Sequence, residues 1–209
     1  MNRSVSSQVR DFDLVSQRRE AIVQAAIRVF RSEGFHSATT RMIAREAKVT
    51  QSNIYNYVRT KGDILYLVCE HLVGLYDDGV AEVLEAHADP HTRLIEALRA
   101  VLRIMMRHKD ELVLLYNETH ALDKPDRRQI LKSVSRLNLT FQRLLADYEA
   151  EAGPVIVANR RVAANLLTFV PAIVALRWWD LSLHAEKGEI EELIFDFILN
   201  GLGIAQAGR

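Results

Sequence analysis

A short polar segment, residues 50–57, carries the side chains of this chain best suited to chemistry. It reads Thr-Gln-Ser-Asn-Ile-Tyr-Asn-Tyr and combines carboxamides with hydroxyls. A carboxamide can pair with adenine through two hydrogen bonds, and a hydroxyl can hold a phosphate oxygen. If the segment is helical, Ile54 and Val58 face inward. The positions left to face outward are Gln51, Asn53, Tyr55, Asn56 and Tyr57. The residues alone leave two interpretations open, a helix that reads DNA and an ordinary polar helix.

The elements that must position this segment are predicted to be short helices. Apolar residues recur at helical spacing over residues 22–30, and Gly34 follows where a C-terminal cap is expected. Thr39 or Thr40 can cap the next helix, and Thr50 can cap the one after it. Two helices of about eight residues, joined by the Ala-Lys-Val turn before Thr50, suit a helix-turn-helix, whose second helix lies in the major groove.

The charge distribution agrees with a DNA-binding front end. The whole chain is neutral, with 27 basic and 27 acidic residues. Residues 1–66 hold 11 Lys and Arg against 6 Asp and Glu, a net of +5, which leaves a net of −5 for the remainder. A basic front and an acidic back fit a protein that presents one end to a polyanion. Chance segregation on a solvated surface is the alternative.

Two stretches resemble the DNA-binding domain of TetR-type regulators. Residues 34–47, Gly-Phe-His-Ser-Ala-Thr-Thr-Arg-Met-Ile-Ala-Arg-Glu-Ala, are similar to its first two helices. Residues 49–65, Val-Thr-Gln-Ser-Asn-Ile-Tyr-Asn-Tyr-Val-Arg-Thr-Lys-Gly-Asp-Ile-Leu, are similar to its recognition helix and the start of its fourth helix. The resemblance implies an all-helical repressor of double-stranded operator DNA, with a variable C-terminal domain for ligand binding and dimerisation.

The resemblance also implies roles for single residues. Thr40 and Tyr55 match phosphate contacts, and Lys61 matches a lysine at the start of the fourth helix, where helix amides and ammonium face phosphate. The positions that can reach bases are Arg41, Gln51, Asn53 and Asn56, and Thr50 and Tyr57 complete the predicted DNA surface. Lys48 stands where glycine is frequent, so we expect a positive φ in its turn. For a lysine this conformation costs about 1 kcal/mol of backbone strain.

The rest of the chain is predicted to be helical as well. No alternating strand pattern occurs, so we expect an all-α fold of about nine helices. The predicted organisation is a flexible N-terminal arm at residues 1–15, a three-helix helix-turn-helix domain at 16–62 and a C-terminal helical ligand-binding and dimerisation domain at 63–209.

The last two predicted helices are apolar. They cover about residues 159–183 and 189–205, and the first is apolar nearly all round, which is typical of a buried helix. Pro171 is expected to kink it by removing a backbone donor. The resemblance implies that these two helices pair with their copies in a homodimer, so that a palindromic operator presents two half-sites.

A small hydrophobic effector is expected in the C-terminal part. Arg177-Trp178-Trp179 resembles a stretch in the branch of TetR regulators that sense acyl-CoA thioesters. Such residues suit that ligand, because Arg can bind a phosphate and Trp can stack on a ring. A regulator of another hydrophobic molecule, of the efflux or drug type, is the alternative, and the tryptophans can equally be structural. The candidate ligand residues are Met105, Met106, Tyr116, Asn117, Glu118, His120, Asn138, Phe141, Phe169, Arg177 and Trp178.

Other function classes are disfavoured. Cys69 is the one cysteine, so no intrachain disulfide can form and a reducing, cytoplasmic setting is expected. No stretch is long and apolar enough to span a membrane. Glu118 and His120 lie two residues apart, on different sides of a helix, which disfavours a metal site. No cofactor or catalytic motif is found, although a helical enzyme or a lipid-binding scaffold would have the same general composition.

Overall fold

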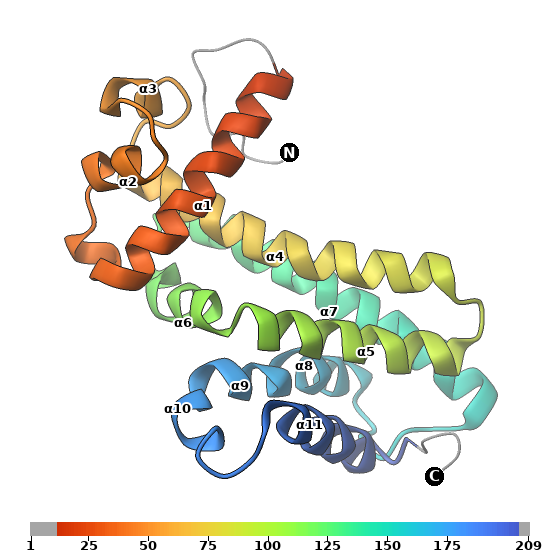
Figure 1. The fold of residues 1–209 in the computed structure, drawn as a ribbon. Helices are drawn as coiled ribbons and strands as arrows, with labels where there is room; N and C mark the ends of the chain where they lie inside the picture. Colours follow the sequence, from red (N-terminus) through yellow and green to blue (C-terminus); the bar gives the residue numbers. More distant parts are fainter. Residues whose placement is uncertain (1–11, 205–209) are drawn as a thin grey trace. The chain divides into compact units, whose positions relative to one another are not determined.

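The computed structural model describes residues 12–204 and contains only helices in that range (Figure 1), which confirms the predicted all-α fold. The helices are α1 Phe12–Ser37, α2 Thr40–Glu46, α3 Gln51–Tyr55, α4 Lys61–Ala86, α5 Pro90–Arg107, α6 Lys109–Glu118, α7 Lys124–Ala152, α8 Arg160–Phe169, α9 Ile173–Leu176, α10 Trp178–Leu181 and α11 Lys187–Leu202. Two 3₁₀ turns, η1 Thr119–Ala121 and η2 Val170–Ala172, lie between them. Within the described residues, none of the helices combines the length and apolar character needed to cross a lipid bilayer.

The chain folds into two compact units. The first contains residues 12–73 and 113–132 of the described chain, and the second contains residues 74–112 and 133–204. Helices α4, α6 and α7 each contribute to both units, so the chain passes between them within helices rather than through loops. We predicted a boundary between residues 62 and 63 that separates DNA binding from ligand binding and dimerisation. That position falls inside the first structural unit.

The first unit is built on α1. Its apolar stripe, which includes Ile22, Ala26 and Phe30, is buried against short helices that bring Ile43 and Ile54 inward. Figure 1 shows α2 and α3 beside α1. The helix α1 begins at Phe12, so the predicted arm is too long: residues 1–11 lie outside the described chain, and residues 12–15 belong to the helix. Gly34 has a φ of 75°, as the predicted cap requires, and α1 kinks there.

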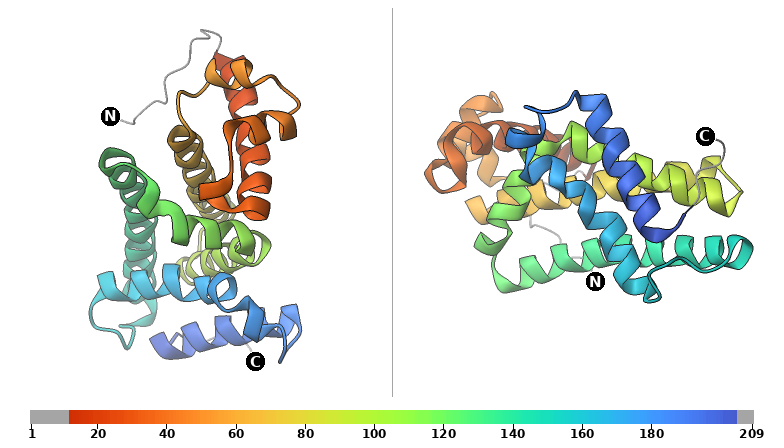
Figure 2. Two further views of the ribbon diagram at one scale, coloured as in Figure 1. Left: turned by 90° about the vertical axis from the view of Figure 1, so that its left-hand side faces the viewer. Right: turned by 90° about the horizontal axis from the view of Figure 1, so that it is seen from below.

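The second unit packs α5 against the C-terminal helices. Buried Leu94, Leu98 and Leu102 form the inner stripe of α5, and Phe195 of α11 is also buried. Arg99 joins α5 to α11, because its Nη1 donates to Glu192 Oε1 at 2.8 Å and its guanidinium lies 3.8 Å from the centroid of the Phe195 ring. Figure 2 shows α8 and α11 lying side by side in both further views.

The predicted helix at 159–183 is divided in three. Pro171 lies in η2, which separates α8 from α9, so the helix is interrupted at the place where its missing N–H predicted a kink. A second break occurs at Arg177, whose φ of −127° and ψ of 14° are not helical. The prediction of one helix here was therefore wrong, and the described chain has more helical segments than the nine that we expected.

Candidate functional site

The helices α2 and α3 form a capped pair. Thr39 Oγ1 accepts from Met42 N, and Thr50 Oγ1 accepts from Asn53 N, each at 3.2 Å. Both predicted caps are confirmed, with Thr39 rather than Thr40 in the first. Ile54 and Val58 are fully buried, as expected from their spacing. The polar side of α3 is thereby held at a fixed orientation on the surface of the first unit.

The turn between α2 and α3 depends on Lys48. Its φ is 56°, which confirms the predicted left-handed conformation. Lys48 N donates to Arg45 O at 3.1 Å and Val49 N donates to Ala44 O at 2.9 Å, so the turn satisfies the last carbonyls of α2 in the manner of a Schellman motif. Glycine adopts this backbone conformation with the least strain, and here the position is occupied by a lysine.

Three predicted DNA-contacting side chains are bonded to one another. Gln51 Nε2 donates to Thr40 Oγ1 at 3.0 Å, and Thr40 Oγ1 lies 3.1 Å from the Tyr55 hydroxyl oxygen. Tyr55 is 41% exposed, whereas Thr40 and Gln51 are half-buried. The structure therefore brings these three predicted residues together at the junction of α2 and α3.

The remaining predicted DNA residues divide by exposure. Arg41 and Thr50 are exposed, and Asn53 and Asn56 are half-exposed, so all four can be reached from outside. Tyr57 differs, because its side chain is only 5% exposed. The helix α3 ends at Tyr55, so the helical period that placed Tyr57 outward no longer applies to it. This burial gives Tyr57 a packing role and argues against the predicted DNA contact.

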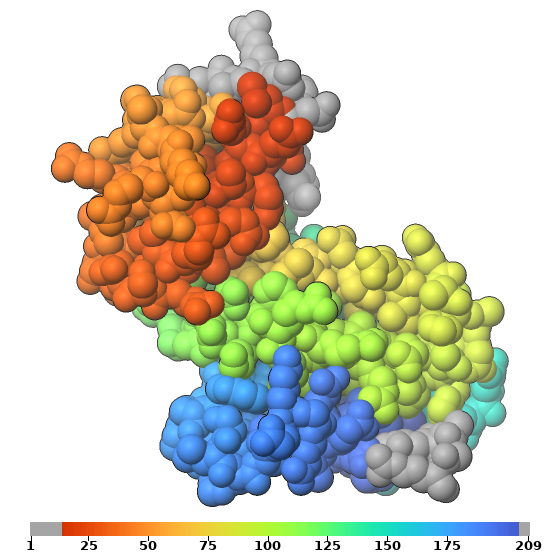
Figure 3. Space-filling view, in the orientation of Figure 1, coloured from red at the N-terminus to blue at the C-terminus, as the bar shows by residue number. Residues whose placement is uncertain are grey.

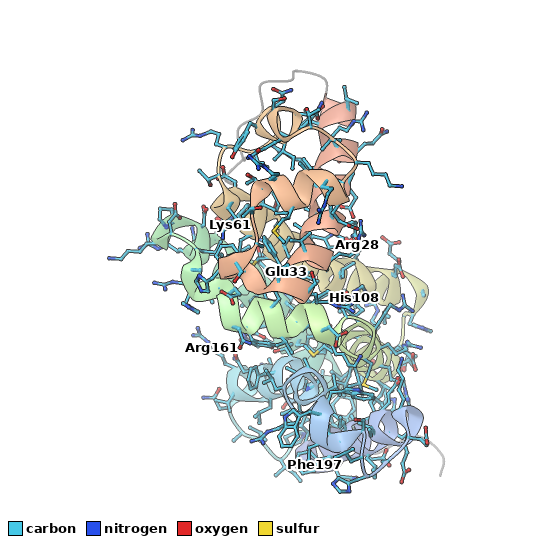
Figure 4. The ribbon with its side chains drawn as sticks, turned by 60° about the vertical axis from the view of Figure 1, so that its left-hand side comes forward. Arg28, Glu33, Lys61, His108, Arg161 and Phe197 are labelled. Atoms are coloured by element: carbon cyan, nitrogen blue, oxygen red, sulfur yellow. The ribbon has the colours of Figure 1, made fainter. Side chains whose placement is uncertain are left out.

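Lys61 is tied to the end of α1. Its Nζ donates to Phe35 O at 2.8 Å and to His36 O and Ala38 O at 3.0 Å, and it lies 4.6 Å from the centroid of the Phe35 ring. All three N–H groups of the ammonium thus have backbone acceptors. Figure 4 labels Lys61 near the first helices. A DNA phosphate bound by Lys61, as we predicted, has to displace one of these carbonyl acceptors or share an N–H group with it.

Four exposed cations surround the α2–α3 pair. Arg41, Arg45, Lys48 and Arg59 form no ion pair with a carboxylate in the described chain. Only Arg41 was among our predicted DNA residues. The others could have been found from the sequence, since a cation on the polar side of a helix-turn-helix is free to face phosphate.

The candidate ligand residues do not form one recognisable site. Met105, Met106 and Phe141 are buried in the second unit, where Phe169 and Arg177 are exposed. The others in the second unit are half-buried Asn138 and Trp178, and those in the first unit are Tyr116, Asn117, Glu118 and His120. Glu118 is turned to α1, with its Oε2 3.5 Å from His36 Nε2. Tyr116 remains 38% exposed, and the partial burial of its side chain raises its pKa.

A cleft of about 300 Å³ lies between α7 and α8 in the second unit. It is lined by Ser135, Asn138, Leu139, Gln142, Arg161 and Asn165. Asn138 Nδ2 donates to Asn165 Oδ1 at 3.0 Å, and Thr168 Oγ1 donates to Asn138 Oδ1 at 2.5 Å. Asn138 is thus the one predicted ligand residue that lines this polar cleft. Among the described residues, no cluster of three or more His, Cys, Asp or Glu is arranged to hold a metal ion.

The two tryptophans at the second helix break have different surroundings. Trp178 is half-buried, and Lys109 Nζ lies 5.2 Å from the centroid of its ring. Trp179 is 66% exposed, with the Arg177 guanidinium 6.0 Å from its ring centroid. One tryptophan therefore packs against the unit, while the other presents a ring and a nearby cation to the surface.

An apolar face covers the outer side of the C-terminal helices, which Figure 3 draws in blue. Its members are exposed in the single chain: Val162, Leu166, Phe169, Ile173, Leu176, Leu193 and Phe197. We call this set the C-terminal apolar face. The helix around Leu166 and Phe169 was predicted to be of the buried kind, and in the single chain only its inner residues, such as Leu167 and Val174, are buried.

Comparisons with known proteins agree with this architecture. A model of the family described as "Bacterial regulatory proteins, tetR family" matches residues 22–66, and one described as "Tetracyclin repressor-like, C-terminal domain" matches residues 87–202. The chain is 36% identical over 191 residues to the HTH-type transcriptional regulator HbdR of Aromatoleum sp. (strain CIB), an alignment that covers 88% of this chain and 83% of HbdR.

Two solved structures share the fold. The regulator FadR from Bacillus subtilis, in complex with stearoyl-CoA, aligns with a TM-score of 0.73 at 16% identity and covers 87% of this chain and 98% of its own. AibR, in complex with isovaleryl coenzyme A and operator DNA, aligns with a TM-score of 0.72 at 16% identity and covers 86% and 97%. At this identity the likeness concerns the fold alone.

Proposed function

Because the chain belongs to the TetR family of transcriptional regulators, which are DNA-binding proteins and not enzymes, we propose that it is a dimeric repressor released from its operator by a small hydrophobic effector. The observation that carries the DNA-binding role is the capped α2–α3 pair, with an exposed polar face and four exposed cations around it. The proposed response to an effector is more specific than the DNA-binding role, and it rests on the helical second unit.

The proposed DNA surface divides its work between two kinds of contact. Arg41, Asn53 and Asn56 reach base edges, because their guanidinium and carboxamide groups match the patterns of the major groove. Tyr55 and the cations Arg45, Lys48 and Arg59 hold phosphates, which fix the register without reading sequence. The second helix of the pair begins with a satisfied cap, so α3 can enter the groove without rearranging.

The test of this surface is its salt dependence. Fluorescence anisotropy with a labelled duplex, selected from a random pool by the wild-type protein, gives the affinity at several salt concentrations. We expect Arg59→Ala to lower the slope of log affinity against log salt by about one unit per protomer, since one phosphate contact is lost. Arg143→Ala, an exposed arginine on α7, is the matched control and leaves the slope unchanged. An unchanged slope for Arg59→Ala and for Arg41→Ala would refute this surface.

The proposed dimer is closed by the C-terminal apolar face. A monomeric soluble protein rarely exposes so many neighbouring large apolar side chains, and a patch of this kind marks an interaction site. A second copy has the same face, and a two-fold axis lets each face cover the other. Two recognition helices related by that axis would read two half-sites, which is why we expect a palindromic operator.

The proposed effector is an acyl-CoA thioester, with another hydrophobic molecule as the second candidate. Two relatives of the same fold are described in complex with acyl-CoA molecules. In this chain, Arg177 and Trp179 offer a cation and an exposed ring, and buried Met105 and Met106 offer adaptable apolar surface. Release requires that the effector binds the non-DNA-binding conformation better than the DNA-binding one. The helix α4 belongs to both units, so it is our candidate for carrying that change.

A gel-shift titration distinguishes the two effector classes. The operator complex is titrated with CoA thioesters of several chain lengths and, in parallel, with the matching free acids. Release by thioesters but not by acids, lost in Arg177→Ala, is the expected result. Equal release by both, or release that Arg177→Ala leaves unchanged, removes the CoA proposal. If thioesters and acids both leave the complex intact while other hydrophobic molecules release it, the second candidate holds.

A further inference from the structure

The hydrogen bonds at the α2–α3 junction form a single chain of donors. Thr40 is the first residue of α2, Gln51 is the first residue of α3 and Tyr55 is its last. Gln51 Nε2 donates to Thr40 Oγ1, which is itself bonded to the Tyr55 hydroxyl. These three side chains therefore connect both ends of the proposed recognition helix to the start of the preceding helix.

Counting hydrogens shows that one hydroxyl proton is left over. Thr40 and Tyr55 carry one hydroxyl proton each, and the bond between them uses one of the two. If Thr40 donates, the free proton belongs to Tyr55, and if Tyr55 donates, it belongs to Thr40. Because Gln51 donates to the Thr40 oxygen, it polarises the Thr40 O–H and favours Thr40 as the donor, since hydrogen bonds in a chain reinforce one another. The free proton then lies on Tyr55, the more exposed of the two side chains.

We propose that Gln51 is a positioning residue, which keeps the Tyr55 hydroxyl proton turned outward as a donor to DNA phosphate, and that it does not read a base. The inference rests on the proposed function, because it needs α2–α3 to be the DNA surface. It replaces the base contact that the sequence predicted for Gln51: base reading is left to Arg41, Asn53 and Asn56, and the carboxamide of Gln51 acts through its neighbours.

Removing the Gln51 donor has a defined consequence. Without that donor the Thr40 O–H is no longer polarised, so the preference for Thr40 as the donor is lost, and the Thr40 oxygen accepts the Tyr55 proton more readily. The Tyr55 oxygen would face the phosphate with lone pairs instead of a proton, and two electron-rich oxygens repel each other. Because phosphates are the same at every base pair, the loss is expected to be equal for all DNA sequences.

The experiment is a double-mutant cycle on two duplexes. Gln51→Met, which has nearly the same length but no N–H, is measured alone and with Tyr55→Phe, on the selected operator and on a random-sequence duplex. We expect Gln51→Met to weaken both duplexes by a similar factor, about fivefold, which corresponds to one hydrogen bond. In the Tyr55→Phe background its effect should fall below about 1.5-fold, because the proton that it positions is absent. Asn53→Leu is the contrast: its loss should be confined to the operator.

The outcomes separate this inference from the proposed function. If the Gln51→Met loss is confined to the operator, or relaxes the preference at one base pair, Gln51 reads a base and the inference is overturned while the DNA surface stands. Full additivity with Tyr55→Phe also overturns it. If Tyr55→Phe binds both duplexes like the wild type, the inference and the proposed Tyr55 phosphate contact fail together, and Arg41→Ala and Arg59→Ala then decide the rest of the surface. If Gln51→Met lowers the melting temperature of the protein, the cycle is repeated with Gln51→Ala, because alanine favours helix formation.

Discussion

The α2–α3 surface and the C-terminal apolar face are both exposed, but they are exposed in different ways. On α2–α3 the side chains are polar and several already hold one another, as Thr40, Gln51 and Tyr55 do. On α8 and α11 the exposed side chains are large and apolar, such as Phe169 and Leu193. The first surface is complete within one chain and suits a polar ligand, whereas exposed apolar side chains of the second kind mark an interaction site. This difference matches the proposed function, in which the first surface binds DNA reversibly and the second joins two copies of the chain.

The largest expected effect is on the apolar face. Phe197, labelled in Figure 4, is 71% exposed in the single chain, so Phe197→Asp should leave the protomer folded. In the proposed dimer the substitution buries two carboxylates among apolar side chains, and we expect the dimer to weaken by more than about 100-fold. Sedimentation velocity over a range of protein concentrations measures this.

The control for that experiment is Leu131→Asp, a comparably exposed apolar position on α7 in the first unit. It should leave the dimer intact. A wild-type protein that sediments as a monomer at micromolar concentration would contradict the comparison, because the apolar face would then be stable without a cover.

The next effect concerns the polar side. Lys61→Met keeps much of the apolar stem but removes the donors to Phe35 O, His36 O and Ala38 O. We expect the free energy of unfolding to fall by about 1–3 kcal/mol, because carbonyls at the end of α1 lose a charged donor. Urea denaturation followed by circular dichroism measures it. Lys132→Met, on an exposed residue of α7, should be nearly neutral. Equal denaturation midpoints for the wild type and Lys61→Met would show that the tie contributes nothing.

A test that needs no substitution reports on the core behind the polar surface. Cys69 of α4 is buried, and burial raises the pKa of its thiol to about 12. At pH 8 the thiol is therefore protonated as well as inaccessible, and a thiol reagent should label it at least about 1000-fold more slowly than a free thiol. Since the chain has one cysteine, labelling in urea gives a clean measure of opening. Complete labelling of the native protein within minutes would mean that the first unit opens far more readily than its packing implies.

The smallest expected effect is at the start of α5, in the second unit. Hydrogen bonds from the hydroxyl and backbone N–H of Thr92 lower the pKa of Asp89. A carboxyl with a lowered folded-state pKa stabilises the fold above its ordinary pKa, and the stabilisation is lost as the pH falls through the folded value. The melting temperatures of the wild type and Asp89→Ala should thus differ at pH 7 and converge in strong acid. A difference that stays constant with pH would show that the cap does not depend on the charge.

The sequence predicted features that depend on near neighbours in the chain. The caps at Thr39 and Thr50, the left-handed turn at Lys48 and the break at Pro171 each follow from a residue type and its immediate context. Lys61 shows the limit of this reasoning, because its acceptors lie 23 to 26 residues away and no local pattern predicts them.

The candidate ligand site was the least predictable part for the same reason. Its proposed residues come from helices far apart in sequence, and contacts in the second unit such as Arg99–Glu192 join residues 93 positions apart. Helical periodicity tells which side of a helix is apolar, but it does not tell whether that side meets the same chain or a second copy. For α8 the sequence therefore indicated an apolar helix, but it did not divide its residues between the buried side, such as Leu167, and the exposed side, such as Leu166.

The turn at Lys48 places two selective demands in opposition. A lysine at a φ of 56° costs about 1 kcal/mol that a glycine would not. Lys48→Gly would relieve that strain and favour heat tolerance, but it would also delete one of the exposed cations beside α3. Directed evolution for thermal survival and directed evolution for operator occupancy should therefore diverge at this position.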